Sequence, residues 1–472
     1  MICRPAAIPF LLAIATATLG AQAPVHPASE QEARAILAEL ININTTTGNG
    51  GTAKSAAAMV ARFKAAGYPA ADIHVLPMSP AYVNLVVRLR GKATGKKPVM
   101  LMAHMDVVAA RREDWSFDPF VFREQDGWYY GRGSEDDKAG VATIVADMVR
   151  WKREGWVPNR DIIAVLTSDE ETNGATIRWL LTKHRDLIDA EYALNADGGG
   201  GALQNGKPVA FTVQASEKVY QDFRLEVTNP GGHSSVPRAD NAIYQLSEGL
   251  ARLSKFTFPL RLNEVSRAFF RQTAATLDGQ LASDMRAVSA TPPDNDAVAR
   301  LSATNPYFNS VMRTTCVATR LEGGHADNAL PQKAAALVNC RMAPDDPADS
   351  VEATLRRVVA DNNIKISRTR ESTPSPPSPL RADLMGPIER LTQKMWPGAV
   401  VVPEMSTGAT DGLYVRNAGI PTYGVAAVFG ELNEQSRAHG RDERVGVKPF
   451  HDAVEFWYQL VKAVATDAKP VP

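Results

Sequence analysis

The feature that most constrains the fold is an apolar run that ends in a histidine and an aspartate. It lies in PVMLMAHMDVV, residues 98–108, where the run leads to His104 and Asp106. A short, unbroken apolar run of this kind predicts a strand that is covered on both faces. A histidine at such a strand end, followed by a carboxylate that orients its ring, is typical of a metal ligand. The triplet is common by chance, so its meaning depends on the rest of the chain.

Three later apolar stretches also lead to polar side chains just after they end. The stretches cover residues 160–168, 191–196 and 421–428, and they are followed by Glu170, Glu171, Asp197 and His439. Before these three stretches, a glycine turn at Gly131 to Gly133 precedes Asp136 and a helix that begins near Lys138. Strands that alternate with helices predict a doubly wound α/β fold, whose ligands bind outside the carboxyl ends of the strands. We therefore expect these side chains to converge.

The converging set would contain two histidines and several carboxylates. Such ligands suit a borderline divalent ion such as Zn²⁺, and their number is sufficient for two ions if one carboxylate bridges them. Paired metal ions activate water for hydrolysis of a carbonyl group. Of Glu170 and Glu171, one would bind metal and the other would take the proton of the water as general base. An acidic pair on its own would more simply be a solvated surface, and only the convergence argues otherwise.

The sequence pattern changes between about residues 217 and 370. Residues 221–228 alternate as in a strand with one solvated face, and helices and further strands follow. Residues 371–380 (ESTPSPPSPL) are rich in Pro and Ser and indicate a linker. We predict a catalytic domain in two parts with an inserted α+β domain between them. The boundaries are 24–216, 217–370 and 371–472.

The N-terminal residues 1–23 have the features of a signal peptide. Arg4 precedes an apolar stretch, and Ala21-Gln22-Ala23 provides a small-x-small cleavage site. The apolar stretch is shorter than the ~20 residues that a membrane-spanning helix requires. The sequence therefore predicts a periplasmic or secreted protein that begins near Pro24 and has no membrane partner after cleavage.

The remaining cysteines, Cys316 and Cys340, would then be in an oxidising compartment. Both lie in strand-like segments joined by a turn-rich connection. If these segments pair as antiparallel strands, the two cysteines can form a disulfide. Two buried free thiols are the alternative, because the sequence does not determine the geometry of the pair.

A series of motifs resembles, in order, those of a dinuclear-zinc peptidase family. They are LMAHMDVV, DGWYYGRGSEDDK, SDEETNG, NADGG, GGHSSVP, GATDG with GIPTYGV, and SRAHGRDE. The family includes carboxypeptidase S, carnosinase-type dipeptidases, aminoacylase, glutamate carboxypeptidase and succinyl-diaminopimelate desuccinylase, and the spacing is most similar to the carboxypeptidase S branch. The resemblance implies a doubly wound catalytic domain with a mixed sheet, an inserted lid and dimerisation domain, and two Zn²⁺ ions per subunit.

The resemblance also implies a role for each converging residue. The expected metal ligands are His104, Asp136, Glu171, Asp197 and His439. Among them Asp136 resembles the bridging carboxylate, and Asp197 would bind the ion opposite the one that His439 binds. Glu170 resembles the general base. Asp106 would lie behind His104 and orient its ring.

Further residues resemble positions of the family that act on the substrate. His233 in GGHSS matches a histidine of the inserted domain that stabilises the oxyanion, often across a dimer interface. Without the resemblance, a turn histidine bonded to its own backbone would be the simpler interpretation. Asn328 and Arg341 match lid residues that contact substrate, and an arginine fork suits a terminal carboxylate. Gly408 and Thr410 belong to the loop that receives substrate.

The predicted function is that of an exported zinc-dependent exopeptidase that hydrolyses short peptides, of the carboxypeptidase or dipeptidase type, as a homodimer. An N-acyl-amino-acid hydrolase with the same mechanism is the alternative. A non-catalytic scaffold with this fold would lack ligands or the base, and a periplasmic solute-binding protein needs no dense set of metal ligands. Lys+Arg and Asp+Glu both number 52, so neither nucleic acid nor a membrane surface is an expected partner.

Overall fold

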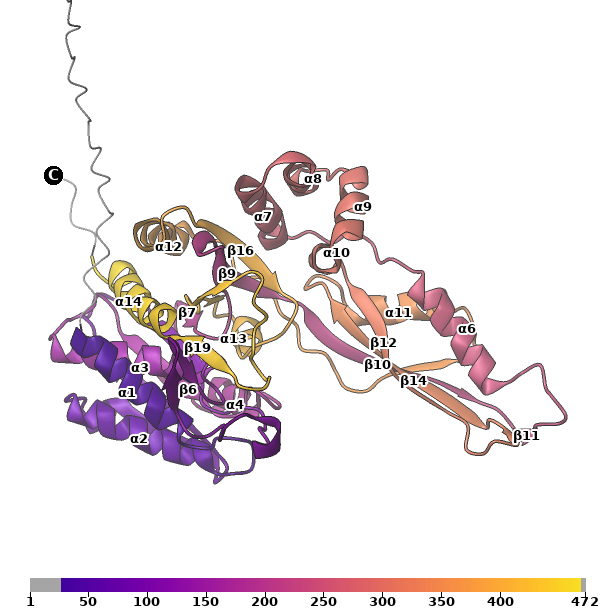
Figure 1. Ribbon diagram of the computed structural model, residues 1–472, viewed down its shortest axis with the longest axis horizontal. Coiled ribbons are helices and arrows are strands. Elements are labelled where there is room, and N and C mark those ends of the chain that lie inside the picture. The colour runs from indigo at the N-terminus through magenta and orange to yellow at the C-terminus, as the bar shows by residue number, and fades with distance from the viewer. Residues whose placement is uncertain (1–26, 468–472) are drawn as a thin grey trace, which may run out of the picture.

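A large sheet flanked by helices forms the body of the molecule, and a smaller sheet extends from it as an arm (Figure 1). The computed structural model describes residues 27–467, so the predicted signal peptide lies outside the described residues. We call residues 219–258 and 315–370 the arm and the other described residues the body. No helix between residues 27 and 467 has the length and apolarity needed to cross a bilayer.

The large sheet has ten strands and is mixed. Its order is β1-β2-β6-β3-β7-β17-β9-β8-β18, with β16 paired to β9. The central strand β3 is parallel to both β6 and β7, whereas β2 is antiparallel to β6. This arrangement confirms the predicted α/β class with a mixed sheet. The strands are β1 (Ile73–Ser79), β2 (Tyr82–Leu89), β3 (Val99–His104), β6 (Ile162–Thr167), β7 (Tyr192–Asn195), β8 (Gly200–Gln204), β9 (Lys207–Glu217), β16 (Val400–Ser406), β17 (Thr422–Gly424) and β18 (Phe429–Glu431).

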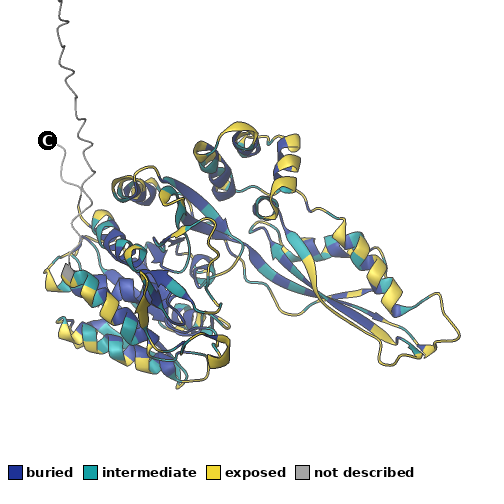
Figure 2. Cartoon of the chain, viewed as in Figure 1, coloured by how far each residue is buried: buried dark blue, intermediate teal, exposed yellow. Residues whose placement is uncertain are grey.

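Helices cover both faces of the large sheet, and this is why its central strands are apolar throughout. Every residue of β3 and β6 is buried (Figure 2). Leu101 and Ala103 pack into one core cluster, and Met100 and Met102 pack into another on the opposite face. The helices of the body outside residues 264–312 are α1 (Pro27–Ile41), α2 (Gly51–Ala65), α3 (Lys138–Arg153), α4 (Ala175–Lys183), α5 (Arg185–Ile188), α12 (Ala382–Met395), α13 (Gly412–Asn417) and α14 (Val447–Val464).

The arm is built on a four-stranded antiparallel sheet in the order β12-β14-β10-β15. Phe223, Leu225 and Val227 are buried on one face of β10, where two helices cover the sheet. At the far end of the arm, two short strands pair with each other. The elements of the arm are β10 (Val219–Thr228), β11 (Gly232–His233), α6 (Ala242–Ser254), β12 (Thr315–Gly323), β13 (Ala329–Leu330), β14 (Lys333–Met342), α11 (Ala348–Val359) and β15 (Lys365–Arg368).

A disulfide joins Cys316 of β12 to Cys340 of β14. The two residues are directly opposite each other in antiparallel strands. Of the two alternatives that the sequence left open, the structure therefore contains the disulfide.

Four helices follow α6 in sequence but pack onto the body. They are α7 (Glu264–Thr273), α8 (Gly279–Ser289), α9 (Asn295–Thr304) and α10 (Pro306–Met312). Val265 and Phe270 of α7 belong to the same core cluster as Val402 and Met405 of β16. The sequence indicated helices within residues 217–370, but side-chain types alone do not show which surface an amphipathic helix packs against.

A small three-stranded sheet connects the glycine turn before Asp136 to the C-terminal loop with His439. It consists of β4 (Arg123–Gln125), β5 (Trp128–Tyr130) and β19 (Arg444–Gly446). The predicted strand at residues 421–428 is shorter than expected, since only Thr422–Gly424 pair with the large sheet.

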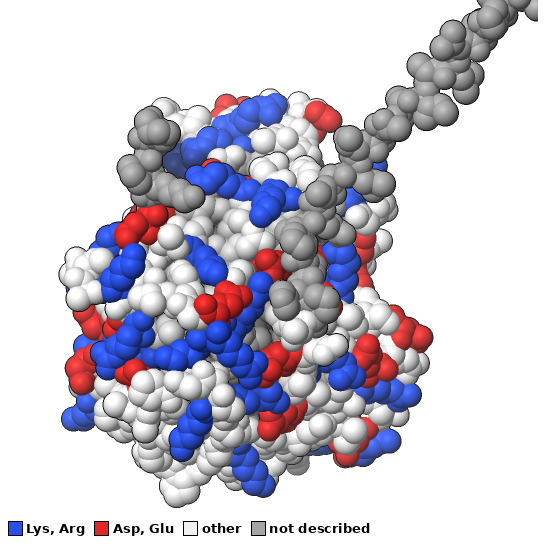
Figure 3. Space-filling view, turned by 90° about the vertical axis from the view of Figure 1, so that its left-hand side faces the viewer, with Lys and Arg blue, Asp and Glu red and all other residues white. Residues whose placement is uncertain are grey.

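Charges of both signs are intermingled on the face of the molecule that Figure 3 shows. Basic and acidic side chains there lie next to one another. This agrees with the equal totals of 52 basic and 52 acidic residues in the sequence.

Candidate active site

The loops at the carboxyl ends of the central strands bring the predicted ligands together. His104 is the last residue of β3, and its Nε2 lies 2.9 Å from Oδ1 of Asp136. Asp136 comes from the turn before α3. The same Nε2 lies 3.9 Å from Oδ2 of Asp197, which follows β7. The expected convergence of three separate segments is thus present.

His439 reaches the same carboxylate from the other side. Its Nε2 lies 3.1 Å from Oδ2 of Asp136 and 3.0 Å from Oε2 of Glu171. The backbone φ of His439 is 64°, a left-handed conformation that few non-glycine residues adopt. Asp136 therefore contacts one imidazole with each oxygen, which is the geometry expected of a bridging carboxylate.

The donor set fits a pair of divalent ions. Two groups of side chains offer ligand atoms that all lie within 4.8 Å of one another. One group is His104, Asp136 and Glu171, and the other is His104, Glu170 and Asp197. Imidazole nitrogens combined with carboxylate oxygens are the ligands that Zn²⁺ takes in hydrolytic sites.

The site concentrates negative charge in a buried place. Burial raises the pKa of Glu170, and it raises the pKa of Asp197 to about 8. Burial opposes charging of His104, but the hydrogen bond and the charge of Asp136 outweigh it and raise the pKa of that imidazole. Hydrogen bonds that the ring of His439 donates to the carboxylates of Asp136 and Glu171 raise the pKa of His439 to about 10. Asp197 and His439 therefore hold protons at neutral pH that a bound cation would displace.

Asp106 supports the site in a different way from the one expected. The sequence predicted that its carboxylate orients the ring of His104, yet Oδ1 lies 3.8 Å from Nδ1. The backbone carbonyl of Asp106 accepts the hydrogen bond from Nδ1 instead, at 3.0 Å. Because a carbonyl only accepts, Nδ1 carries a proton, and Nε2 is the nitrogen that faces the ligand cluster and would bind a metal ion once deprotonated.

The carboxylate of Asp106 holds the loop that carries the two glutamates. Oδ1 accepts from the backbone amide of Glu170 at 3.2 Å, and Oδ2 accepts from that of Glu171 at 3.1 Å. The preceding residue, Asp169, accepts from the amides of Ala175 and Thr176 at the start of α4. Carboxylates thus fix this loop from both sides.

A buried ion pair that the sequence did not predict shapes the loop of Asp136. Glu443 Oε1 accepts from the backbone amides of Gly133, Glu135 and Asp136, at 3.1, 2.8 and 3.1 Å. Its other oxygen lies 2.5 Å from Nη1 of Arg132. Glu443 belongs to the motif SRAHGRDE and Arg132 to the glycine turn, so both were in recognised stretches, but nothing in the sequence indicated their pairing.

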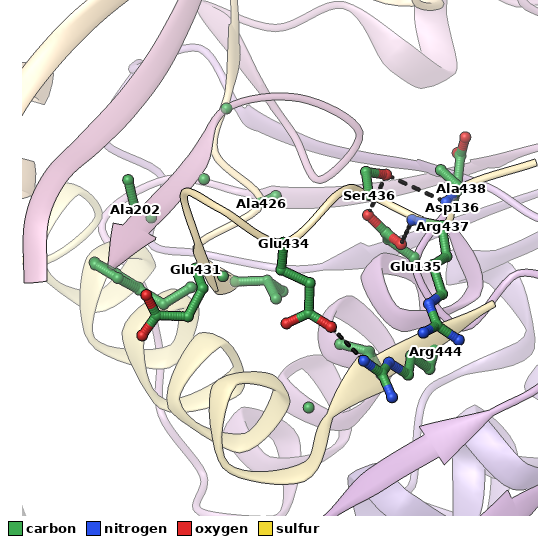
Figure 4. A pocket seen from close by; sticks show the side chains of 18 of the residues that line it. Glu135, Asp136, Ala202, Ala426, Glu431, Glu434, Ser436, Arg437, Ala438 and Arg444 are labelled. Carbon is green, nitrogen blue, oxygen red and sulfur yellow. Dashed lines mark hydrogen bonds and ion pairs between the residues drawn. The ribbon is translucent and has the colours of Figure 1, made fainter. Parts of the chain in front are cut away.

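Beside the ligand cluster lies a cavity of about 560 Å³ (Figure 4). Asp136 and Asp197 line it, together with the glycines at residues 198–201. A Cβ at Gly199 would lie 2.6 Å from the carbonyl oxygen of Thr212, so only glycine permits this close approach. Apolar lining comes from Trp128, Ala202, Ala426, Val428, Phe429 and Leu432. We call this space the apolar cavity.

The outer wall of the apolar cavity is held by polar contacts. Glu135 accepts from the hydroxyl of Ser436 at 2.6 Å and from the amide of Arg437 at 2.9 Å. Figure 4 also shows Glu434 paired with Arg444. The contacts of Glu135 tie the loop before His439 to the segment that carries Asp136.

A second pocket, of about 510 Å³, lies between the body and the arm. Three predicted substrate residues line it with Glu170, namely Arg341, Gly408 and Thr410. Nη1 of Arg341 donates to the carbonyl of Thr407 at 3.3 Å. We call this space the arginine pocket, because Arg178 and Arg370 line it as well.

A buried ion pair holds the substrate loop to the last strand before the arm. Arg416 Nη2 lies 2.8 Å from Oε1 of Glu217, the last residue of β9. The hydroxyl of Thr410 donates to the same oxygen at 2.7 Å and accepts from Nδ2 of Asn195 at 3.3 Å. The loop and the segment leading to Asp197 are therefore part of one hydrogen-bonded network.

Two residues that were predicted to act on the substrate, His233 and Asn328, lie far from the ligand cluster of their own chain in space. His233 is exposed in β11, and Oγ of Ser235 lies 2.7 Å from its Nδ1. Asn328 is nearby, since its carbonyl accepts from the amide of Ser234 at 3.1 Å. Figure 1 places β11 at the end of the arm that is remote from the body.

Comparison with known proteins agrees with this geometry. The model of peptidase family M20/M25/M40 matches residues 100–463. Human N-fatty-acyl-amino acid synthase/hydrolase PM20D1 is 28% identical over 398 residues, which cover 81% of this chain and 77% of that protein. Probable carboxypeptidase S-like 2 of Dictyostelium discoideum is 28% identical over 393 residues, with 81% and 74% covered.

A solved structure with the same fold is that of an M20 family metallo-carboxypeptidase from Sulfolobus solfataricus. It has a TM-score of 0.67 and 17% identity, and the match covers 92% of this chain and 99% of the other. The family match spans both parts of the body and the arm between them. The chain belongs to peptidase family M20/M25/M40 and is a hydrolase of peptide or amide bonds.

Proposed function

We propose that the protein is an exported, zinc-dependent exopeptidase that hydrolyses short peptides, of the carboxypeptidase or dipeptidase type. The observation that carries the proposal is the position of Glu170. It lies within 4.8 Å of ligand atoms of His104 and Asp197, and it also lines the arginine pocket. A carboxyl group with a raised pKa, placed between a metal centre and a substrate pocket, suits a general base.

His104, Asp136, Glu171, Asp197 and His439 would hold two metal ions. Such a pair supplies Lewis acidity at the scissile carbonyl and lowers the pKa of the attacking water. Glu170 takes the proton of that water and later passes it to the nitrogen of the leaving amine. The amides of Glu170 and Glu171, bonded to Asp106, keep the base and the adjacent ligand in place.

Arg341 supports cleavage at the end of a chain. Its guanidinium lines the same pocket as Glu170, and a planar fork binds a terminal carboxylate through two parallel hydrogen bonds. A peptide held by this carboxylate places its last amide bond, rather than an internal one, near the base. Gly408 and Thr410, in the loop between β16 and α13, would contact the substrate backbone.

A homodimer would complete the site. His233 and Asn328 lie together at the remote end of the arm, so they do not reach the ligand cluster of their own chain. In a two-fold dimer formed through the arms, the partner's His233 would stabilise the oxyanion of the tetrahedral intermediate. The exposed edge strand β12 and helix α6 carry Val317, Leu321, Ile243 and Tyr244, which are exposed apolar residues and suit such an interface.

An N-acyl-amino-acid hydrolase is the second candidate, and the apolar cavity favours it. This cavity borders Asp136 and Asp197, and apolar side chains such as those of Trp128, Val428 and Phe429 line part of it beside charged ones, so it offers an apolar surface to an acyl chain as well as to an apolar residue. The similar human protein is named as a hydrolase of N-fatty-acyl amino acids. Both candidates use the same residues and differ only in what precedes the scissile amide.

Export is supported by the disulfide between Cys316 and Cys340. Disulfides of this structural kind are typical of proteins outside the cytosol. N-terminal sequencing of the protein recovered from the periplasm or the medium tests export, and we expect it to begin near Pro24. Recovery of a full-length chain from the cytosol alone would contradict it.

A substrate panel separates the two candidates. The mature protein with added Zn²⁺ is assayed on dipeptides and tripeptides beside acetyl- and long-chain acyl-amino acids. Release of C-terminal residues from unblocked peptides supports the exopeptidase, and turnover of acylated amino acids alone would move the assignment to the second candidate. Failure to hydrolyse either class would contradict both.

A further inference from the structure

The arginine pocket contains more positive charge than one terminal carboxylate requires. Arg178 comes from α4 of the body, Arg341 from β14, and Arg370 from the chain just after β15. Arg178 and Arg370 belong neither to the ligand cluster nor to the predicted substrate residues. They lie on opposite sides of the gap between the body and the arm.

Aromatic rings hold the three guanidinium groups in place. The guanidinium carbons of Arg341 and Arg370 lie 4.6 and 4.3 Å from the ring centroid of Tyr220. The corresponding carbon of Arg178 lies 5.3 Å from the centroid of Tyr414. Tyr220 and Tyr414 both line the pocket. Stacking restricts the flexible side chains, so less entropy is lost when they bind an anion.

Within residues 27–467, none of these three arginines forms an ion pair with a carboxylate. Arg178 donates only to the backbone carbonyls of Asn173 and Gly174. The contrast with Arg368, two residues before Arg370, is informative. Arg368 pairs with Asp349, Glu352 and Glu371.

The acidic side chains that line the pocket do not neutralise these arginines. Oε2 of Glu371 lies 3.5 Å from Nη1 of Arg368, an arginine that does not line the pocket. Glu170 belongs to the metal centre, Asp411 is buried, and neither carboxyl group forms an ion pair with these arginines within residues 27–467. Burial lowers the pKa of Arg341, and the charge of Arg370 adds to this effect whereas Tyr220 and Asp222 oppose it. The two like charges of Arg341 and Arg370 favour a bound anion.

We propose that the arginine pocket selects substrates whose C-terminal residue is acidic. Arg341 holds the terminal α-carboxylate, and Arg370 with Arg178 holds the side-chain carboxylate of an aspartyl or glutamyl residue. The inference rests on the proposed function, whose site it refines. It assigns the acidic residue to the leaving side of the scissile amide, whereas the apolar cavity takes the group on the other side.

The physical basis is a difference between two nearly isosteric residues. Glutamate and glutamine have the same length, but only glutamate forms charge-assisted hydrogen bonds with the guanidinium groups. A neutral amide would leave these donors poorly paired. We expect a preference of roughly 10- to 100-fold in kcat/KM for glutamate, the range that one or two such contacts produce.

The test compares Ala-Glu with Ala-Gln, and acetyl-Glu with acetyl-Gln, on the zinc-loaded full chain. Glu-Ala measures whether the acidic residue must be at the C-terminal position, and we expect no gain over Gln-Ala. The variants R370Q and R178Q should each reduce the ratio of kcat/KM for Ala-Glu over Ala-Gln by about 10-fold, because each removes one charge-assisted contact.

R357Q is the matched control. Arg357 also lies over an aromatic ring, with its guanidinium carbon 5.5 Å from the centroid of Phe256, but it is exposed on α11 and does not line the pocket. This variant should keep the wild-type ratio. Equal kcat/KM for Ala-Glu and Ala-Gln in the wild type, or an unchanged ratio in R370Q and R178Q, would overturn the proposal.

A binding measurement separates this proposal from the proposed function. Calorimetry on the metal-free protein compares free glutamate with free glutamine, and we expect glutamate to bind at least about tenfold more tightly, with the difference lost in R370Q. If no substrate is hydrolysed but this difference is found, the proposed function fails and the anion pocket stands. If substrates are hydrolysed without any difference in rate or binding, only the pocket proposal fails.

Discussion

Oδ1 of Asp106 accepts a hydrogen bond from the backbone amide of Glu170 at 3.2 Å. Asp106, which follows the ligand His104 in sequence, thereby fixes the backbone position of the proposed base Glu170 in the neighbouring loop. Both groups are at the carboxyl ends of neighbouring strands, β3 and β6. Because the hydrogen bond is to the backbone, the side chain of Glu170 remains free to exchange protons.

Glu170→Gln should retain the metal ions and lose most of its turnover. The ligand atoms of His104, Asp136, Glu171 and His439 are untouched, but an amide cannot take a proton from water. We expect kcat to fall by about 10²- to 10⁴-fold, which is the usual contribution of a general base. Metal content by elemental analysis and steady-state kinetics check this. Glu113→Gln, at an exposed position in the loop after β3, is the control, and near-wild-type turnover in Glu170→Gln would exclude Glu170 as the base.

Metal binding should release protons at neutral pH. The pKa of Asp197 is raised to about 8 and that of His439 to about 10, so both groups are protonated at pH 7 without metal. A bound cation requires both to be deprotonated. Zn²⁺ affinity should therefore rise with pH between about 6 and 9, and calorimetry in buffers of different ionisation enthalpy should show net proton release. An affinity that does not change over this range would contradict the ligand assignment.

Subunit mixing tests whether His233 acts across a dimer. His233→Ala and Glu170→Ala should each be almost inactive as pure proteins. In a mixed dimer, one of the two sites combines an intact Glu170 with the partner's His233. Random mixing after dissociation should restore about a quarter of wild-type activity, because half of the dimers are mixed and each has one complete site. No recovery, with mixed dimers demonstrated by mass spectrometry, would place His233 outside the catalytic centre.

The disulfide between Cys316 and Cys340 should stabilise the arm. The two cysteines are 24 residues apart in sequence, and closing such a loop contributes about 3 kcal/mol to the free energy of unfolding. The double variant Cys316→Ala/Cys340→Ala should unfold at lower urea concentration than the wild type. A reducing agent should lower the wild-type midpoint and leave the variant unchanged. Equal midpoints in oxidising buffer would show that the bridge contributes nothing.

The positions of the ligands could be predicted from sequence because each depends on local patterns. An apolar run followed by a polar residue indicates a buried strand and its end, and parallel strands end at the same edge. His104, Glu170 and Asp197 were placed in this way. Asp136 and His439 came from a helix start and a loop, and the resemblance of the flanking motifs linked them to the others.

Contacts between distant segments could not be predicted in the same way. Glu443 and Arg132 pair across most of the chain, and neither has a neighbour in sequence that indicates the other. Arg178 lies on the body and Arg370 on the arm, and the two face each other only across the arginine pocket. The bond from His104 to the carbonyl of Asp106, rather than to its carboxylate, depends on a loop conformation that the side-chain types do not specify.

The most direct test of the account is the metal content of the mature protein, measured together with its activity. The site predicts two Zn²⁺ ions per chain by elemental analysis, loss of amide hydrolysis on treatment with a chelator, and recovery when Zn²⁺ is returned. Asp136→Ala, which removes the carboxylate that contacts both His104 and His439, should bind neither ion tightly. A protein that contains no metal after Zn²⁺ is added, or that hydrolyses its substrates equally well with chelator present, would contradict the proposed centre.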